Sequence, residues 1–160
     1  MANFVTKKGH VTLGFIQTPA GLINYQDYHL KDAFRRGLPT SARDEQFVHF
    51  HFMGFTSNHF IAGCSLSKSS LQTAVFFYLF DRQKNEVVLK KGCRIEDGNA
   101  DLTLNPDAGS SRLKSKGMEV TFMISPHKQS RELIIFLDGQ EVLNLLIEGK
   151  EIDTLRLCTP

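Results

Sequence analysis

Apolar and polar side chains alternate with a period of two through the middle of the chain, a pattern typical of β-strands. Three successive strands are expected there, separated by short polar turns: Gln46–Thr56, His59–Ser67 and Leu71–Arg82. A shorter strand, Glu86–Lys91, is expected after a further polar turn. Strands joined by turns this short run antiparallel, so the pattern predicts a meander.

The same alternation returns in the last third of the chain. It predicts three further strands, Met118–Ser125, Glu132–Leu137 and Glu141–Ile147. The last two are separated by Asp138-Gly139, a residue pair that strongly favours a two-residue hairpin turn. Between the two meanders, residues 96–117 are rich in Gly, Asn, Asp and Ser and are expected to be mostly loop.

Shorter elements are predicted towards the ends. His10–Ile16 and Thr154–Cys158 carry β-forming residues and are expected to be short strands. One short helix is expected near residues 27–36, because its apolar residues share a helical face and a glycine follows as a C-terminal cap. Residues 38–45 are predicted to be a polar link.

The predicted fold class is all-β, a mostly antiparallel meander arranged as a sandwich or as a lipocalin-like open barrel, with that one helix. A chain of 160 residues can bury about two-thirds of its surface, which is enough for one core. We therefore expect residues 1–160 to form a single β-rich domain.

Some predicted strands are apolar on both faces. In Leu71–Arg82, Phe77 and Leu79 lie on one face, while Phe76 and Tyr78 lie on the other. Such strands need cover on both faces, from a second sheet, from another copy of the chain, or from a segment outside this sequence. Because the sequence stops at Pro160, just after the predicted strand Thr154–Cys158, with no polar tail, one expectation is that this is the N-terminal half of a longer two-part protein. A homo-oligomer is the alternative.

Composition narrows the class of partner. The charge is nearly balanced, with 19 Lys and Arg against 17 Asp and Glu, so no nucleic-acid partner is predicted. No apolar run reaches the ~20 residues of a membrane span, and the first residues lack a secretory signal core. The three cysteines form no CxxC pair, which is typical of a reduced chain and predicts a cytoplasmic location.

Several stretches together resemble a known family. They are Gly14–Tyr28 with its Gly-Phe, Pro and Asn-Tyr, then Phe50–Thr56, Ile61–Leu66, Ala74–Asp81 and Leu155–Pro160. In residue type and spacing they are similar to the first half of the bacterial family called domain of unknown function 2804. Members are about twice this length, which implies a missing C-terminal half, and the family name implies no activity. By looser fold analogy, such proteins resemble lipocalin-like barrels related to carotenoid hydratases.

His49 and His51 form the sharpest candidate site. Alternate residues of a strand share a face, so the two imidazoles lie a little under ~7 Å apart along the backbone. Both could reach one metal ion, but a third ligand is needed, and the expected hairpin register pairs His59 with Thr56, away from His51. Three interpretations stay open for the pair: a hydrogen-bonded polar seam, a ligand contact, or a metal site. No metal is predicted.

Two further residues are candidate ligand contacts. Asn24 belongs to a polar group with Tyr25, Asp27 and Tyr28 that could bind a hydroxylated ligand, or that could simply form a turn and a helix cap. Tyr78 would add one polar group to the aromatic strands.

Two functions follow from these residues. The first is a non-catalytic β-domain that binds an apolar small molecule, or forms half of a lipocalin-like fold, with His49, His51, Tyr78 and Asn24 as ligand contacts. The alternative is an enzyme, hydratase- or isomerase-like or metal-dependent, in which His49 and His51 act as general acid or base or bind a metal. No cofactor is predicted, because no phosphate-loop pattern occurs.

Overall fold

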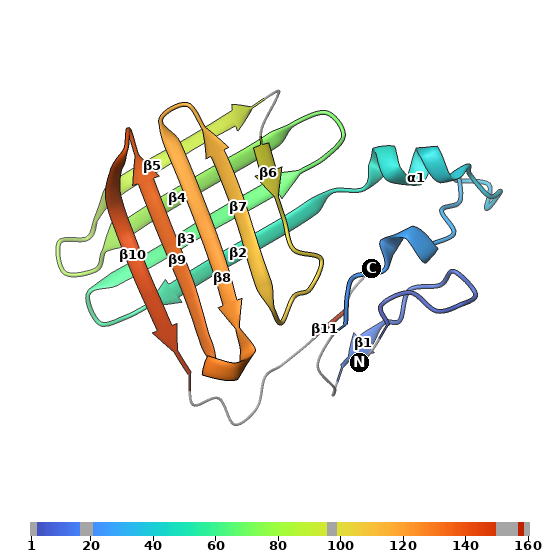
Figure 1. The fold of residues 1–160 in the computed structure, drawn as a ribbon, viewed down its shortest axis with the longest axis horizontal. Coiled ribbons are helices and arrows are strands. Elements are labelled where there is room, and N and C mark those ends of the chain that lie inside the picture. The colour runs from blue at the N-terminus through green and yellow to red at the C-terminus, as the bar shows by residue number, and fades with distance from the viewer. Residues whose placement is uncertain (1–2, 17–20, 96–98, 150–156, 159–160) are drawn as a thin grey trace.

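A computed structural model describes residues 3–16, 21–95, 99–149 and 157–158 of the chain. The fold is mostly β and antiparallel, as the sequence predicts. One sheet has four strands in the order β2-β3-β4-β5, and the other has five in the order β10-β9-β8-β7-β6. In both sheets each strand lies beside its neighbour in sequence, so the chain forms two meanders (Figure 1).

The four-stranded sheet consists of β2 His49–Thr56, β3 Phe60–Lys68, β4 Thr73–Asp81 and β5 Glu86–Ile95. The five-stranded sheet consists of β6 Asn99–Asp101, β7 Gly109–Ser115, β8 Met118–Ser125, β9 Ser130–Leu137 and β10 Gln140–Glu148. A short 3-10 helix, η2 Pro126–Lys128, connects β8 and β9.

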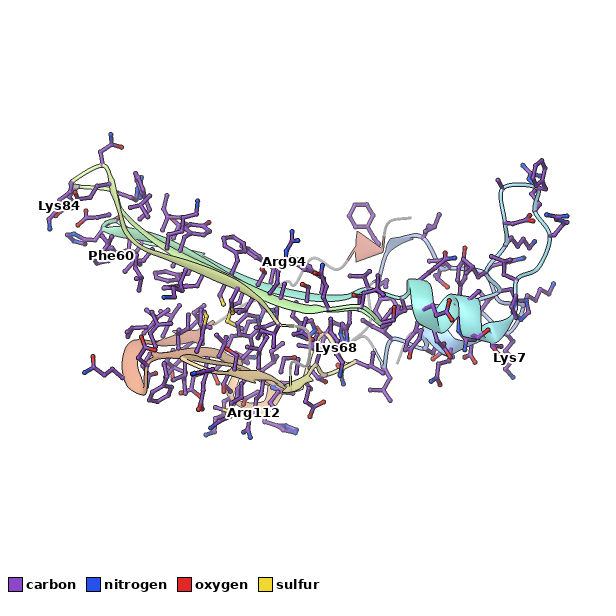
Figure 2. The ribbon with its side chains drawn as sticks, turned by 90° about the horizontal axis from the view of Figure 1, so that it is seen from above. Lys7, Phe60, Lys68, Lys84, Arg94 and Arg112 are labelled. Carbon is purple, nitrogen blue, oxygen red and sulfur yellow. The ribbon has the colours of Figure 1, made fainter. Side chains whose placement is uncertain are left out.

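The two sheets pack face to face as separate layers (Figure 2). Their inner side chains form one core that includes Leu66 and Phe77 from one sheet and Leu113, Leu133 and Ile135 from the other, all of which are almost fully buried. Of the two architectures expected from the sequence, the protein has the sandwich. The second sheet covers one of the two apolar faces of β4, and the other face is described below.

The N-terminal segment and α1 lie beyond one end of the sandwich (Figure 1, Figure 2). This region contains η1 Tyr25–Asp27 and α1 Thr40–Gln46. It also contains β1 Gly14–Phe15, which pairs antiparallel with β11 Leu157–Cys158. Among the described residues, the strands predicted at the two ends are represented by β1 and β11 only. Residues 154–156 of the predicted strand Thr154–Cys158 lie outside the described residues.

The helix predicted near residues 27–36 is wrong. Tyr28, directly after η1, is extended, and Lys31 then pairs with Gly37 around a tight loop. The Asp32 carboxylate accepts hydrogen bonds from the backbone N–H groups of Phe34 and Arg36, and Arg35 has a φ of 62°. Hydrogen bonds from a side chain to the backbone compete with the backbone hydrogen bonds of a helix. The loop therefore forms here, although the apolar residues have helical spacing. The helix instead occupies Thr40–Gln46, which covers most of the predicted polar link and the first residue of the predicted strand after it.

The prediction that residues 96–117 are mostly loop is also wrong, because β6 and β7 lie within this stretch. The turn between β2 and β3 is longer than predicted. Ser57 donates its N–H to the Phe60 carbonyl, so His59 lies in the turn and Thr56 pairs with Ile61 instead of His59. His59 therefore does not lie beside His51. The predicted register was wrong, but it had led to the same conclusion. The other predicted strands are confirmed within a few residues.

Candidate functional site

The first candidate site is an inner polar cluster between the sheets, at the end of the sandwich nearest α1. Its members are His49, His51, Lys68 and Ser111. His49 and His51 share the inward face of β2 with buried Met53, so the predicted alternation of this strand is confirmed. Lys68 pairs with His49 in the β2–β3 register and lies on the same side of the sheet, facing the other sheet (Figure 2).

Ser111 connects the two sheets within this cluster. Its Oγ lies 2.8 Å from Nδ1 of His51 and accepts a hydrogen bond from the backbone N–H of Thr103 at 3.1 Å. Ser111 is fully buried, and hydrogen bonds of this kind fix the orientation of an imidazole ring. His51 therefore has its Nδ1 side occupied and its ring held in one position.

His49 is 8% exposed, and its ring makes an edge contact with His51 at a centroid distance of 5.1 Å. Its Nε2 is enclosed and has no hydrogen-bond partner among the described residues. Burial lowers the pKa of His49, and the neighbouring His51 and Lys68 lower it further, while the backbone of Thr103 acts in the opposite direction. Burial also lowers the pKa of His51. Both imidazoles are thus held towards their neutral form.

Lys68 makes a structural contact at this end of the sandwich. Its Nζ donates a hydrogen bond of 2.8 Å to the Ala100 carbonyl of β6. A cation beside two imidazoles disfavours a metal ion, and the described residues contain no group of three His, Cys, Asp or Glu side chains that could hold one. The cluster fits a polar seam between the sheets better than a metal centre.

An aromatic stack joins the cluster to the N-terminal segment. The rings of Tyr25 and Phe47 are parallel, with centroids 3.7 Å apart, and Phe47 lies 5.8 Å from the His49 ring. The stack places η1 against Phe47, two residues before β2 begins, and Phe47 in turn lies next to the His49 ring.

The second candidate site is on the opposite side of the four-stranded sheet. We call it the outer aromatic face, and it consists of Phe50, Phe52, Phe76 and Tyr78. Phe50 is 57% exposed, Phe52 is 54% exposed and Phe76 is 39% exposed. The rings of Phe76 and Tyr78 are nearly parallel, at 18°, with centroids 5.7 Å apart. Apolar rings gathered on one exposed face usually mark an interaction site.

Glycines keep this face flat. A Cβ added at Gly63 of β3 would lie 2.6 Å from the Tyr78 ring and 3.0 Å from the Phe52 ring. One added at Gly54 of β2 would lie 2.9 Å from Phe52. The two aromatic rings therefore lie over the glycine backbone of β2 and β3, and together they form a platform.

The predicted ligand contacts are thus divided between two surfaces. Odd-numbered residues of β4, such as Phe77, point into the core, so Tyr78 points outward, whereas His49 and His51 point inward. These three residues do not line one pocket. Sequence parity could not reveal this, because β4 is apolar on both faces.

Asn24 belongs to neither surface and has a structural role. Its Oδ1 accepts a hydrogen bond from the Val5 N–H at 3.0 Å, and its Nδ2 donates to the Val5 carbonyl and to Asp27 at 2.9 and 2.7 Å. The side chain thereby ties the N-terminal hairpin to η1. Of the two interpretations given by the sequence, the geometry supports the turn.

A groove of about 610 Å³ lies in the same region, lined in part by Lys7, Lys31 and Arg43. Arg43 is already engaged, because it pairs with Asp44 and donates a hydrogen bond to the Gln26 carbonyl. None of the groove residues belongs to a strand of the sandwich.

Comparisons with protein-family models, with curated proteins and with solved structures give no match for this chain. The resemblance described above therefore stays a hypothesis. No helix in the described ranges has the length and apolar character needed to cross a bilayer.

Sequence reasoning missed Ser111, Lys68, Phe50 and Phe52 as site residues. Ser111 gave no signal, because it stands in a Gly-Ser-Ser run that is typical of a turn. Phe50 and Phe52 did give one: they alternate with the inward histidines of the same strand, so both had to face outward.

Proposed function

We propose that this chain is a non-catalytic β-domain that binds an apolar small molecule on its outer aromatic face. One observation carries the proposal: Phe50 and Phe52 are more than half exposed on a flat sheet face, beside Phe76 and Tyr78. Fully burying a side chain of this size stabilises a complex by roughly 1.5–3 kcal/mol. A ligand covering several of these rings gains enough to offset much of the cost of its immobilisation.

The sandwich core supports this location over a cavity between the sheets. The largest inward side chains, among them Phe77, Leu66 and Leu133, are almost fully buried against one another. An apolar ligand is therefore accommodated more readily on the outer face, where the rings are already accessible.

The test is a titration with N-phenyl-1-naphthylamine, a neutral apolar probe whose fluorescence rises on burial. We expect saturable binding to one site, with affinity at least tenfold lower in the Phe52→Ser and Phe76→Ser variants. The control is Phe34→Ser, which removes a phenylalanine that is 80% exposed in the N-terminal segment, outside both sheets. Equal losses in all three variants, or no saturable binding, would contradict the proposal.

Light scattering on the same variants identifies other occupants of the face. A dimer that dissociates on Phe52→Ser would show that a second copy covers the platform, and would overturn the proposal. The hypothesis that the chain is half of a two-part, lipocalin-like fold predicts a different result. A longer chain carrying the second part would lose binding of the probe.

A second proposal is the enzyme in which His49 and His51 act as general acid or base or hold a metal. The observation in its favour is the enclosed Nε2 of His49, which has no hydrogen-bond partner in the described part of the chain. A titration of the ring ¹H–¹³C signals with Zn²⁺ tests the metal form. Saturable shifts of both His49 and His51 would support it, and shifts confined to the exposed His127 would exclude it.

A further inference from the structure

The outer aromatic face has a charge of one sign along its β5 side. Lys90 pairs with Tyr78 across β4 and β5, and Arg94 pairs with Ala74, so both cations lie on the same face as the rings. Figure 2 shows Arg94 on the outer side of the four-stranded sheet. Neither cation has an ion-pair partner among the described residues.

No acidic residue of the four described strands lies beside these cations. The acidic residues within the four strands are Asp81 and Glu86, which pair with each other at the far end of β4 and β5. Asp81 is on the inward side, where its carboxylate accepts the backbone N–H groups of Gln83 and Lys84. Among the described residues of the four strands, the charged side chains that border the aromatic platform are therefore positive.

Gly92 leaves an opening between the two cations. It stands midway between Lys90 and Arg94 on β5 and directly opposite Phe76 on β4. Among the described residues, a Cβ added at Gly92 would lie at ordinary van der Waals distances, 3.5 Å from the Val75 carbonyl oxygen and 3.7 Å from Cβ of Phe76, so a small group fits above the Gly92 backbone. Successive residues of a strand are about 3.3 Å apart, so each cation is within side-chain reach of this opening.

From this arrangement we infer that the ligand is an amphiphilic anion. Its apolar body lies over Phe52, Phe76 and Tyr78, and its carboxylate or sulfonate-like head lies above Gly92, between Lys90 and Arg94. This inference rests on the proposed function and adds the charge of the ligand. A carboxylate or sulfonate accepts hydrogen bonds from Lys and Arg, and these charge-assisted bonds are among the stronger ones in proteins.

The same charges disfavour a second copy of the chain as the occupant. A face-to-face dimer would bring two further cations and no acidic group of the described face into one apolar interface. Like charges brought together in this way oppose association. Charge complementarity therefore favours an anionic ligand.

Two probes with the same ring system test the inference. 1-Anilinonaphthalene-8-sulfonate is N-phenyl-1-naphthylamine with a sulfonate added, so the pair differs in the anionic head alone. We expect the sulfonate to bind at least tenfold more tightly to the unchanged protein. In the double variant Lys90→Gln, Arg94→Gln, its affinity falls about tenfold, while the affinity of the neutral probe stays the same.

The matched control is Arg112→Gln, which removes a cation from the outer side of the other sheet (Figure 2). An equal loss of sulfonate binding in this control would overturn the inference, because the effect would then be one of overall charge. Equal binding of both probes to the unchanged protein would overturn it and leave the proposed function standing. Binding of neither probe would overturn both.

Competition with dodecanoate and dodecyl sulfate, both below the concentration at which they form micelles, distinguishes the head groups. Displacement of the fluorescent sulfonate by either one supports the inference, and the stronger competitor identifies the preferred head. Equal displacement by the neutral dodecyl maltoside would contradict it.

Discussion

Ser111 of β7 and His51 of β2 meet between the sheets, with Oγ and Nδ1 2.8 Å apart. Because Ser111 also accepts a hydrogen bond from the Thr103 N–H, replacing Ser111 with alanine leaves two half-buried polar groups without this partner. We expect Ser111→Ala to lower the free energy of unfolding by about 1–3 kcal/mol, measured by urea denaturation. The control is Ser110→Ala on the opposite face of the same strand, which should change it little. Equal effects of the two substitutions would mean that the bond adds no stability.

Stability should also fall as the solution becomes acidic. Burial lowers the pKa of His49 and of His51 in the folded state, so below pH about 6.5 the unfolded chain binds more protons than the folded one. The free energy of unfolding should therefore decrease as pH falls from about 6.5 towards the lowered pKa values, by up to ~1.4 kcal/mol per pH unit for each histidine.

Urea denaturation at pH 7.5 and at pH 5.5 measures this decrease. The double variant His49→Gln, His51→Gln should show a smaller decrease, whereas His127→Gln, which alters an exposed histidine, should behave like the unchanged protein. An unchanged decrease in the double variant would assign the pH dependence to other groups.

The flat platform predicts opposite effects for two glycines of the four-stranded sheet. Gly63→Ala forces the Tyr78 and Phe52 rings away from the sheet, because its Cβ would lie 2.6 and 3.0 Å from them. We expect a loss of about 1–3 kcal/mol in stability, with weaker binding of the neutral probe. Gly92→Ala meets no such contact and should be neutral or stabilising by about 0.5–1 kcal/mol. Thermal unfolding distinguishes the two, and equal shifts would contradict the platform geometry.

The hairpin between β9 and β10 depends on Gly139. Asp138 and Gly139 have φ angles of 49° and 80°, and Leu137 pairs with Gln140, as in a two-residue turn with both central residues left-handed. Apart from its chain neighbours, no atom of the described residues lies within 4 Å of a Cβ added at Gly139, so Gly139→Ala tests backbone strain. It should destabilise the fold by about 1–2 kcal/mol in urea denaturation. Asp138→Asn should be tolerated, because asparagine also adopts this conformation.

Period-two alternation was enough to predict most of the sandwich. It was strong in β2 and β8, where one set of alternate residues carries the buried side chains. It failed for β7, because Ser111 is polar and yet fully buried, held there by His51 and Thr103 from other elements. A bond made between distant strands leaves no local trace in the sequence.

The helix was misplaced for a similar reason. The Asp32 carboxylate accepts hydrogen bonds from the backbone of the loop that follows it. These bonds favour the loop over the helix that the spacing of Leu30 and Phe34 predicts. The actual helix, Thr40–Gln46, buries none of its residues and so has no apolar stripe to reveal it. As to the site, the sequence predicted His49, His51 and Tyr78 as candidate contacts but could not assign the faces of β4, since both are apolar.

The pairing of β1 with β11 has a consequence for how the protein is made. Strands β2 to β10 each lie beside a neighbour in sequence, apart from the step between the sheets, so each can join the growing structure as it leaves the ribosome. Gly14 and Phe15, made before all of them, pair with Cys158 and Leu157, made after all of them. During synthesis β1 must therefore wait without its partner strand while both sheets assemble, and its docking is a late, long-range step.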